Sequence, residues 1–432
     1  MGKQMARFDE QDFDEKRLAR RARRKKSQMA AYITLGVIVV VVLGLLIFGI
    51  HMLRKALGSK PAAEEATVEA TEEVSSEPAV IETPEETEEV QEYTEEELMD
   101  EVLGNILSEM TLEDKVAGLF LVTPEQLTGV DTAVKAGTGT QEALASYAVG
   151  GVIYAPKNIK STDQIKEMLE TTATMSKYPI FTILSEQSAA ADSVKTTLGT
   201  EPDAEITDTE TSMNAGNKAG SELFKNGFNF AITPDMEVSE EALFGADIDT
   251  VKELTSAYMT GMQDAGVTSC GYLFPLKGDT ASGMATSEAT REDLVIGEYE
   301  VFKNAIDSGI GAMMVSNISL PELTGDNTPA CLSDKIVEDE LRGALGFNGI
   351  VITAPLNEKA VTEYYTSKDA AIAAIKAGAD MIYIPENFEE AYAGLLAEVQ
   401  DGNISEERIN ESLRRIYSIK YADKVGRISS GG

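Results

Sequence analysis

Two groups of polar residues stand directly after apolar runs, and their residue types suit acid–base chemistry in the first group and ligand binding in the second. In the stretch GYLFPLKGDT, Lys277 and Asp279 follow an apolar run and enclose a glycine. In the stretch PIFTILSEQ, Glu186 and Gln187 occupy the same kind of position. A carboxylate beside a proton donor at the end of a strand can serve as a general acid or base. The structural alternative is a tight Gly-Asp turn for the first group and a solvated strand end for the second.

Eight short β-rich runs alternate with helical patterns and would position these residues. The runs are AGLFLVT (117–123), GGVIYAP (150–156), PIFTILSE (179–186), FNFAIT (228–233), VTSCGYLFP (267–275), IGAMMVSN (310–317), GIVITAP (349–355) and ADMIYIP (379–385). Their lack of polar alternation indicates strands buried on both faces of a parallel sheet. The pattern predicts an α/β fold, a (β/α)8 TIM-type barrel over residues 98–425, with its chemistry at the carboxyl ends of the strands. A doubly wound open sheet is the alternative, but no G-x-G-x-x-G follows the first run.

Helical patterns fill the segments between the runs. Examples are STDQIKEMLETTATMSK, SMNAGNKAGSELFKNG and TREDLVIGEYEVFKNAIDSG. Several begin at a Ser or Thr that can cap a helix and end at a Gly before the next run. This order of elements is the one that a barrel of parallel strands requires.

An apolar segment at residues 28–53 precedes the barrel and predicts a transmembrane helix. No Asp, Glu, Lys or Arg occurs between Lys26 and Arg54, and this length is sufficient to cross a bilayer. The basic stretch KRLARRARRKK before it predicts a cytoplasmic tail at residues 1–27. A cleaved signal peptide is the alternative, and it would need a shorter apolar core and a small-x-small cleavage site. We therefore expect a single-pass protein of the cell membrane with an extracytoplasmic barrel.

Residues 54–97 are rich in glutamate and predict a disordered acidic linker. No Lys or Arg occurs from Pro61 to Asp114, so the segment repels itself and lacks apolar surface to bury. A solvated helix is the alternative for its last part, YTEEELMDEVLGNIL. Residues 426–432 are expected to form a flexible tail. The formal net charge of −36 argues against nucleic acid as a partner.

The chain has few residues that could bind a metal or form disulfides. It contains Cys270, Cys331 and a single histidine, His51. We therefore expect neither a disulfide framework nor a metal site. A single Cys270–Cys331 bridge stays open, although the apolar run around Cys270 favours a small buried thiol.

Several ordered motifs resemble a known family. The segments LSEMTLEDKVAGLFLV, GGVIYAPKNI, FPLKGDT, AMMVSN, LRGALGFNGIVIT and ISEERINESLRRI are similar to the N-terminal barrel domain of glycoside hydrolase family 3, and most resemble its single-domain bacterial β-N-acetylhexosaminidases. The resemblance covers residues 98–425. It implies cleavage of β-linked N-acetylglucosamine from cell-wall fragments or related glycans, without a cofactor. It also implies an Asp nucleophile and a His acid/base steadied by a neighbouring Asp.

The residues that would carry this mechanism are altered. The family pattern after the seventh strand is similar to VITDDL, whereas this chain has VITAPL and places Ala354 at the nucleophile. The family's KHFPGHGDT is YLFPLKGDT here, which places Lys277 at the acid/base and retains Asp279. A methyl group cannot form a glycosyl ester. A lysine with a pKa of about 10.4 is a poor acid, and Asp279 alongside would raise that pKa further.

The resemblance also places candidate sugar-binding residues. Tyr272 stands at the Lys of the family's Lys-His pair, and Glu186 and Gln187 fall within its altered DQEGGRV motif. Asn317 replaces the His of VSH, and Glu237 replaces an Asp after the fourth strand. These five are the residues that we expect to contact a sugar.

Three functions are compatible with these substitutions. The first is a membrane-anchored pseudoglycosidase that binds carbohydrate or cell wall, or acts as a scaffold. The second is an active β-N-acetylhexosaminidase that uses displaced groups. Glu358 is the carboxylate nearest to Ala354, but its position predicts a first-turn helix charge instead. The third is a structural spacer. Loss of both the nucleophile and the acid/base favours the first, because either loss alone costs orders of magnitude in rate.

Overall fold

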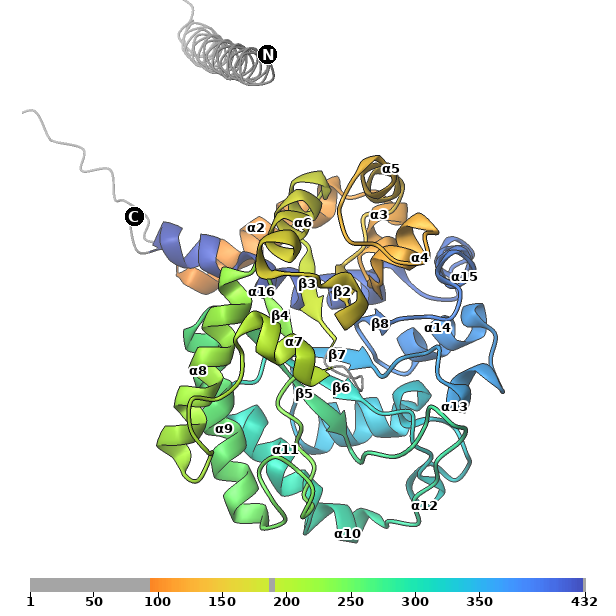
Figure 1. Cartoon of the computed structure of the whole chain (residues 1–432). Coiled ribbons are helices and arrows are strands. Elements are labelled where there is room, and N and C mark those ends of the chain that lie inside the picture. The colour runs from red at the N-terminus through yellow and green to blue at the C-terminus, as the bar shows by residue number, and fades with distance from the viewer. Residues whose placement is uncertain (1–93, 186–190, 430–432) are drawn as a thin grey trace, which may run out of the picture. The chain divides into compact units, whose positions relative to one another are not determined.

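The computed structural model describes residues 94–185 and 191–429, and its described strands form a closed parallel barrel (Figure 1). The eight-stranded sheet has the order β7-β6-β5-β4-β3-β2-β1-β8. The strands are β1 (Phe120–Val122), β2 (Gly151–Tyr154), β3 (Phe181–Leu184), β4 (Phe230–Ala231), β5 (Thr268–Phe274), β6 (Ala312–Val315), β7 (Ile350–Thr353) and β8 (Ile382–Tyr383). β1 pairs with β8, and a bridge from Ile352 to Met381 closes the ring. The TIM-type barrel is thus confirmed, and the open doubly wound sheet is excluded.

Each predicted β-rich run contains one of these strands. All residues of β2, β3, β6 and β7 are buried, because the barrel interior covers one face of each strand and the surrounding helices cover the other. The strands pair in parallel, and Ile183 in β3, for example, lies opposite Phe230 in β4. The absence of polar alternation was therefore a correct indicator of a sheet buried on both faces.

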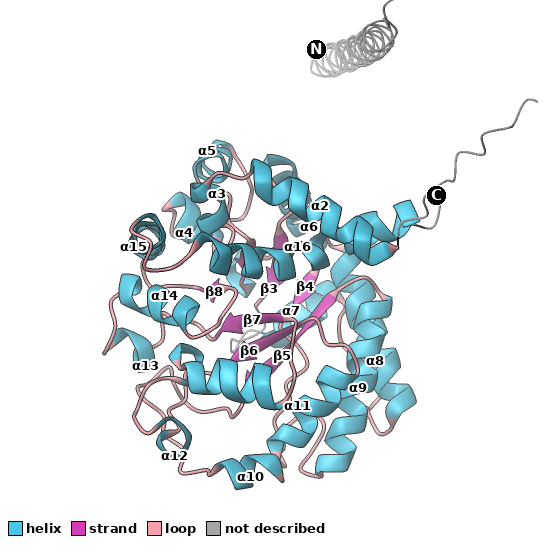
Figure 2. Ribbon diagram, turned by 180° about the vertical axis from the view of Figure 1, so that it is seen from behind, coloured by secondary structure: helices cyan, strands magenta, loops and turns pink. Residues whose placement is uncertain are grey.

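The helices surround the strands, as Figures 1 and 2 show from opposite sides. They are α2 (Glu95–Glu109), α3 (Leu112–Ala117), α4 (Pro124–Thr128), α5 (Thr138–Ser146), η1 (Pro156–Asn158), α6 (Thr162–Met175), α7 (Ala191–Leu198), α8 (Thr209–Lys225), α9 (Ile248–Asp264), α10 (Arg291–Val295), α11 (Glu298–Asp307), α12 (Pro321–Thr324), η2 (Ala330–Leu332), η3 (Lys335–Ala344), α13 (Lys359–Thr362), α14 (Ser367–Lys376), α15 (Phe388–Gln400) and α16 (Glu406–Ser429).

Helix boundaries differ from the sequence expectations at three places. The pattern TREDLVIGEYEVFKNAIDSG forms two helices, α10 and α11, because Gly297 leaves the helical region with φ −120° and ψ −116°. α2 begins at Glu95, within the expected linker, since Thr94 and Glu97 form a reciprocal capping box. α16 extends to Ser429, beyond the expected end of the barrel at residue 425.

Helices α8 and α9 pack so closely that their backbones touch. A Cβ on Gly216 would lie 2.0 Å from the carbonyl oxygen of Tyr258, and a Cβ on Gly261 would lie 2.1 Å from that of Met213. Neither position has room for a side chain, so glycine is required for this helix pair.

The expected N-terminal segments lie outside the described residues. These are the basic tail at 1–27, the transmembrane helix at 28–53 and all but the end of the linker at 54–97, which stay predictions. Between residues 94 and 429, apart from 186–190, no helix combines the length and the apolar character that crossing a membrane requires. Cys270 and Cys331 are both buried free thiols, so the bridge left open by the sequence does not form.

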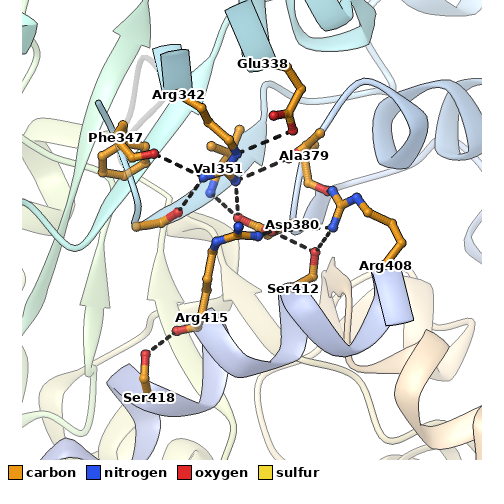
Figure 3. Close-up of polar contacts among 12 residues, drawn as sticks. Glu338, Arg342, Phe347, Val351, Ala379, Asp380, Arg408, Ser412, Arg415 and Ser418 are labelled. Carbon is orange, nitrogen blue, oxygen red and sulfur yellow. Dashed lines mark hydrogen bonds and ion pairs between the residues drawn. The ribbon is translucent and has the colours of Figure 1, made fainter. Parts of the chain in front are cut away.

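A buried carboxylate, Asp380, gathers polar groups at the amino-terminal end of the barrel (Figure 3). It lies just before β8. Its oxygens accept hydrogen bonds from Val351 N at 2.9 Å, Arg342 Nη2 at 2.7 Å, Ser412 Oγ at 2.7 Å and Arg415 Nη1 at 3.0 Å, and Arg408 Nη1 lies 3.9 Å away.

This cluster attaches two outer elements to the barrel. Arg342 comes from η3, whereas Arg408, Ser412 and Arg415 come from α16. Arg408 also donates to the carbonyl of Ala379 at 2.8 Å. Desolvation lowers the pKa of Arg408 from its ordinary value, although the charge of Asp380 acts in the opposite direction. One buried aspartate therefore binds three partly buried arginines.

We expect Asp380→Asn to destabilise the fold strongly, because it removes the charge that compensates the arginines. Breaking a buried ion pair on one side costs about 3–5 kcal/mol. Urea denaturation followed by circular dichroism measures the free energy of unfolding. The matched control, Asp401→Asn, changes an exposed aspartate at the end of α15 and should stay within about 0.5 kcal/mol of the parent. Equal stability of the two variants would contradict this role for Asp380.

Candidate functional site

The carboxyl ends of β4 and β5 are joined beyond the regular sheet. Asp235 forms a parallel bridge with Tyr272, Met236 N donates to the carbonyl of Tyr272 at 2.7 Å, and Tyr272 N donates to that of Pro234 at 3.2 Å. This extension places Asp235 and Glu237 beside the loop that follows β5. The two residues are two apart, so they point to the same side of the extended chain.

Lys277 lies between these two carboxylates. Its Nζ donates to Asp235 Oδ2 at 2.8 Å and to Glu237 Oε2 at 2.9 Å, and it lies 5.9 Å from the ring centre of Tyr272. Asp235 Oδ1 also accepts the backbone N–H of Glu237 at 3.1 Å, which fixes the two acidic residues relative to each other. We call Lys277, Asp235 and Glu237 the ion cluster.

The ion cluster keeps the lysine protonated. Partial burial lowers the pKa of Lys277, but hydrogen bonds and charges from Asp235 and Glu237 outweigh it and raise the pKa above its ordinary value. From the sequence we correctly predicted a raised pKa for Lys277, but we attributed the rise to Asp279 instead of Asp235 and Glu237. Asp279 is exposed, and its carboxylate accepts the N–H of Ser282 at 3.3 Å, as in a turn. Such a lysine is a weaker acid than a free one.

Ala354 follows β7 and presents a methyl group at the mouth of the barrel. It is 2% exposed, and its N–H donates to the carbonyl of Val315 at 2.7 Å. Neighbouring Asn317 is completely buried and donates to the carbonyl of Pro355 at 2.8 Å. The Cys331 thiol donates to Asn317 Oδ1 at 3.0 Å. The amide of Asn317 is thus engaged within the protein.

Glu358 is turned into the mouth, contrary to its interpretation as a helix charge. It occupies the N-cap position of α13, but its side chain makes no capping hydrogen bond. Instead, Oε2 accepts from Thr280 Oγ1 at 2.5 Å and from Asn317 Nδ2 at 2.9 Å. This carboxylate connects the loops after β5, β6 and β7.

A cavity of about 530 Å³ lies at the carboxyl ends of β4 and β5. The residues around it include Lys195, Thr233, Asp235, Glu237, Tyr272 and Lys277. Ala354, Asn317 and Glu358 are not among its described lining residues. Burial, which is the largest effect, raises the pKa of Tyr272 to about 12, so its hydroxyl stays neutral and can donate a hydrogen bond. The cavity is in the size range of small-ligand sites.

The structure brings some of the predicted site residues together and separates others. Tyr272, Lys277 and Glu237 share the cavity, whereas Asn317 belongs to the cluster around Glu358. Glu186 and Gln187 lie outside the described residues. Sequence reasoning missed Asp235, although the spacing Asp-x-Glu after β4 was a usable signal. Within the described ranges no group of three or more His, Cys, Asp or Glu is arranged to hold a metal.

We expect Glu358→Ala to lower the free energy of unfolding by about 1–3 kcal/mol, because Thr280 and Asn317 lose a charged acceptor. Glu363→Ala is the matched control, since Glu363 is exposed at the end of the same helix and should change stability by about 0.5 kcal/mol or less. Urea denaturation of both variants tests the difference. Similar stabilities would show that Glu358 does not connect the three loops.

Comparison with known proteins relates this chain to a family of glycosyl hydrolases. The family described as "Glycosyl hydrolase family 3 N terminal domain" matches residues 111–419. A "Beta-hexosaminidase" of Methylobacillus flagellatus is 25% identical over 276 residues, which are 58% of this chain and 78% of the relative. A "Beta-N-acetylglucosaminidase/beta-glucosidase" of Cellulomonas fimi is 26% identical over 63% of this chain, but the match spans only 52% of that relative.

Solved structures agree with this match. The glycoside hydrolase family 3 β-N-acetylglucosaminidase of Paenibacillus sp. superposes with a TM-score of 0.64 at 25% identity, and 73% of this chain covers 63% of that one. The β-N-acetylhexosaminidase of Beutenbergia cavernae has a TM-score of 0.61 at 24% identity, with 72% of this chain on 99% of that one, and supports the fold alone. Family match, barrel topology and ordered motifs agree, and the chain belongs to the family of the glycosyl hydrolase family 3 N-terminal domain.

Proposed function

We propose that this chain is a catalytically impaired member of its family, which binds carbohydrate or cell-wall glycan, or acts as a scaffold, instead of hydrolysing it. The proposal rests on the side chains at the two positions where the family resemblance places the nucleophile and the acid/base. Ala354 offers a buried methyl group, and Lys277 is held by Asp235 and Glu237. Retaining glycosidases need a nucleophilic carboxylate on one face of the sugar and a proton donor on the other. Neither position supplies its group.

Other carboxylates at the mouth are engaged in ways that support this proposal. Glu358 Oε2 accepts two hydrogen bonds from the loops around it. Asp235 and Glu237 are bound to Lys277. To attack an anomeric carbon, each of these carboxylates would have to give up its contacts or use its second oxygen. The cavity over β4 and β5 nevertheless keeps polar groups that suit a hydroxyl-rich ligand, which favours binding over loss of the site.

The proposed location is the outer face of a cell membrane. Its basis is the sequence: the apolar span at 28–53 and the basic residues before it. A barrel carried on an acidic linker outside the membrane could meet cell-wall glycan.

An active β-N-acetylhexosaminidase is the second candidate. The names of the relatives favour it, since those matched over residues of this barrel are described as hexosaminidases or N-acetylglucosaminidases. In that case Asp279, or one of the cavity carboxylates, would have to take part in catalysis. A structural spacer without ligand is the third candidate.

We expect the purified full chain not to hydrolyse a chromogenic N-acetyl-β-glucosaminide above the rate of a heat-inactivated sample. The reason is the combined loss of nucleophile and acid/base, each of which typically contributes orders of magnitude. Absorbance of the released phenol is the measurement. Turnover that Asp279→Ala abolishes and Asp401→Asn preserves would establish the active enzyme instead.

A variant that reintroduces the nucleophile and the acid/base tests whether their absence limits the reaction. It combines Ala354→Asp and Lys277→His with Glu358→Gln, which removes the like charge nearest to the new aspartate. Turnover gained by this variant and absent from the parent would show that the missing groups limit the reaction. Failure to gain turnover despite glycan binding would instead indicate that the mouth has lost the geometry for hydrolysis.

We expect muropeptide fragments that contain N-acetylglucosamine to raise the melting temperature of the full chain. A ligand at one hundred times its Kd stabilises the folded state by about 2.7 kcal/mol. Tyr272→Phe removes a hydroxyl from the cavity wall and should reduce the shift. Tyr364→Phe, at an exposed tyrosine outside the lining, is the control. A parent chain that shows no shift would favour the spacer.

A further inference from the structure

A second cavity, of about 460 Å³, lies at the amino-terminal end of the strands, opposite the candidate site. Thr268 and Phe181 begin β5 and β3, and Gly311 directly precedes β6. The residues around the cavity include Phe181, Phe224, Thr268, Gly311, Ile419 and Lys420. Most of this wall is apolar, and Phe224 is 56% exposed at its rim. The volume is sufficient for a small organic ligand.

Lys420 of α16 supplies the cationic group of this cavity. Its Nζ donates to the carbonyl of Gly150 at 2.7 Å. The same atom lies 4.6 Å from the ring centre of Phe181 and 5.0 Å from that of Tyr417. An ammonium has three N–H donors, and only one of them is used by this carbonyl. The ring faces contribute weaker cation–π attraction.

No carboxylate balances this ammonium within the part of the chain that the structure describes. None of the ion pairs found there includes Lys420, and Asp423 on the cavity wall is exposed. Lys115 shows how a buried lysine is usually neutralised, since its side chain pairs with Glu406 at 2.6 Å. Although Lys420 as a residue is only partly buried, desolvation lowers the pKa of its ammonium to about 7. The protonated form of Lys420 thus has no carboxylate partner among the described residues.

We propose that this cavity binds a small carboxylate that carries an apolar ring or chain, with the carboxylate on Lys420 Nζ and the apolar part against Phe181, Phe224 and Ile419. Such a ligand supplies the missing negative charge and favours the protonated lysine. Its carboxylate accepts a charge-assisted hydrogen bond from a donor that the protein leaves unused. Its apolar part covers the remaining wall. The site does not depend on the proposed function, because it lies at the other end of the barrel.

Phenylacetate and its neutral amide, phenylacetamide, are matched probes for this site. Titration calorimetry or ligand-observed NMR on the full chain measures both Kd values. We expect phenylacetate to bind roughly tenfold more tightly or better, as one charge-assisted hydrogen bond predicts. Lys420→Met should reduce phenylacetate to the affinity of the amide. Lys424→Met is the control, since Lys424 is an exposed lysine one turn further along α16 and should leave both affinities unchanged.

A second variant keeps the test valid if Lys420→Met fails to fold, because that change also removes the donor to Gly150. Ala422 is exposed and lines the cavity. Ala422→Trp should fill the space and weaken both probes roughly tenfold without changing the lysine. The proposal is overturned by equal affinity of the two probes for the parent chain. It is equally overturned by absence of phenylacetate binding at about 10 mM, or by unchanged binding in Ala422→Trp.

Discussion

The buried carboxylate of Asp380 fixes the amino-terminal end of the barrel. It accepts the N–H of Val351 in β7 and also binds arginines from η3 and α16. A buried charge is unfavourable unless partners surround it. Here the partners come from the outer layer, so the carboxylate joins that layer to the strands. Because Asp380 binds Val351 in β7, it also fixes the position of the carboxyl end of that strand, where Ala354 lies. This contact does not depend on the side chain at residue 354.

The residues that stabilise the fold around Asp380 and the residues of the candidate site therefore lie at opposite ends of the barrel. In TIM-type barrels the amino-terminal face supports the fold, and the carboxyl-terminal loops carry the reaction. The Asp380 cluster belongs to the first face and shares no residue with the cavity over β4 and β5. Substitution at Ala354 or Lys277 therefore leaves the supporting contacts intact. The architecture therefore does not depend on the side chains at these two positions.

The sequence predicted the barrel well and the contacts at its mouth poorly. The strands were predictable because a buried parallel strand has a local signature, a short apolar run. The break at Gly297 was visible only as a glycine in an otherwise helical pattern. The partners of Lys277 were not predictable, because Asp235 and Glu237 reach it only through the bridge between Asp235 and Tyr272. Contacts between distant loops have no such local signature.

The resemblance to a family singled out positions 277 and 354, but it could not predict the contacts made there. Lys277 offsets the repulsion between Asp235 and Glu237, which the hydrogen bond from Glu237 N to Asp235 Oδ1 holds together. Replacing Lys277 alone would leave two carboxylates without their cation. Likewise, a carboxylate at position 354 would enter a wall that Glu358 already shares with Asn317. The side chains at positions 277 and 354 are thus coupled to their neighbours, so the effect of replacing one of them depends on the residues around it.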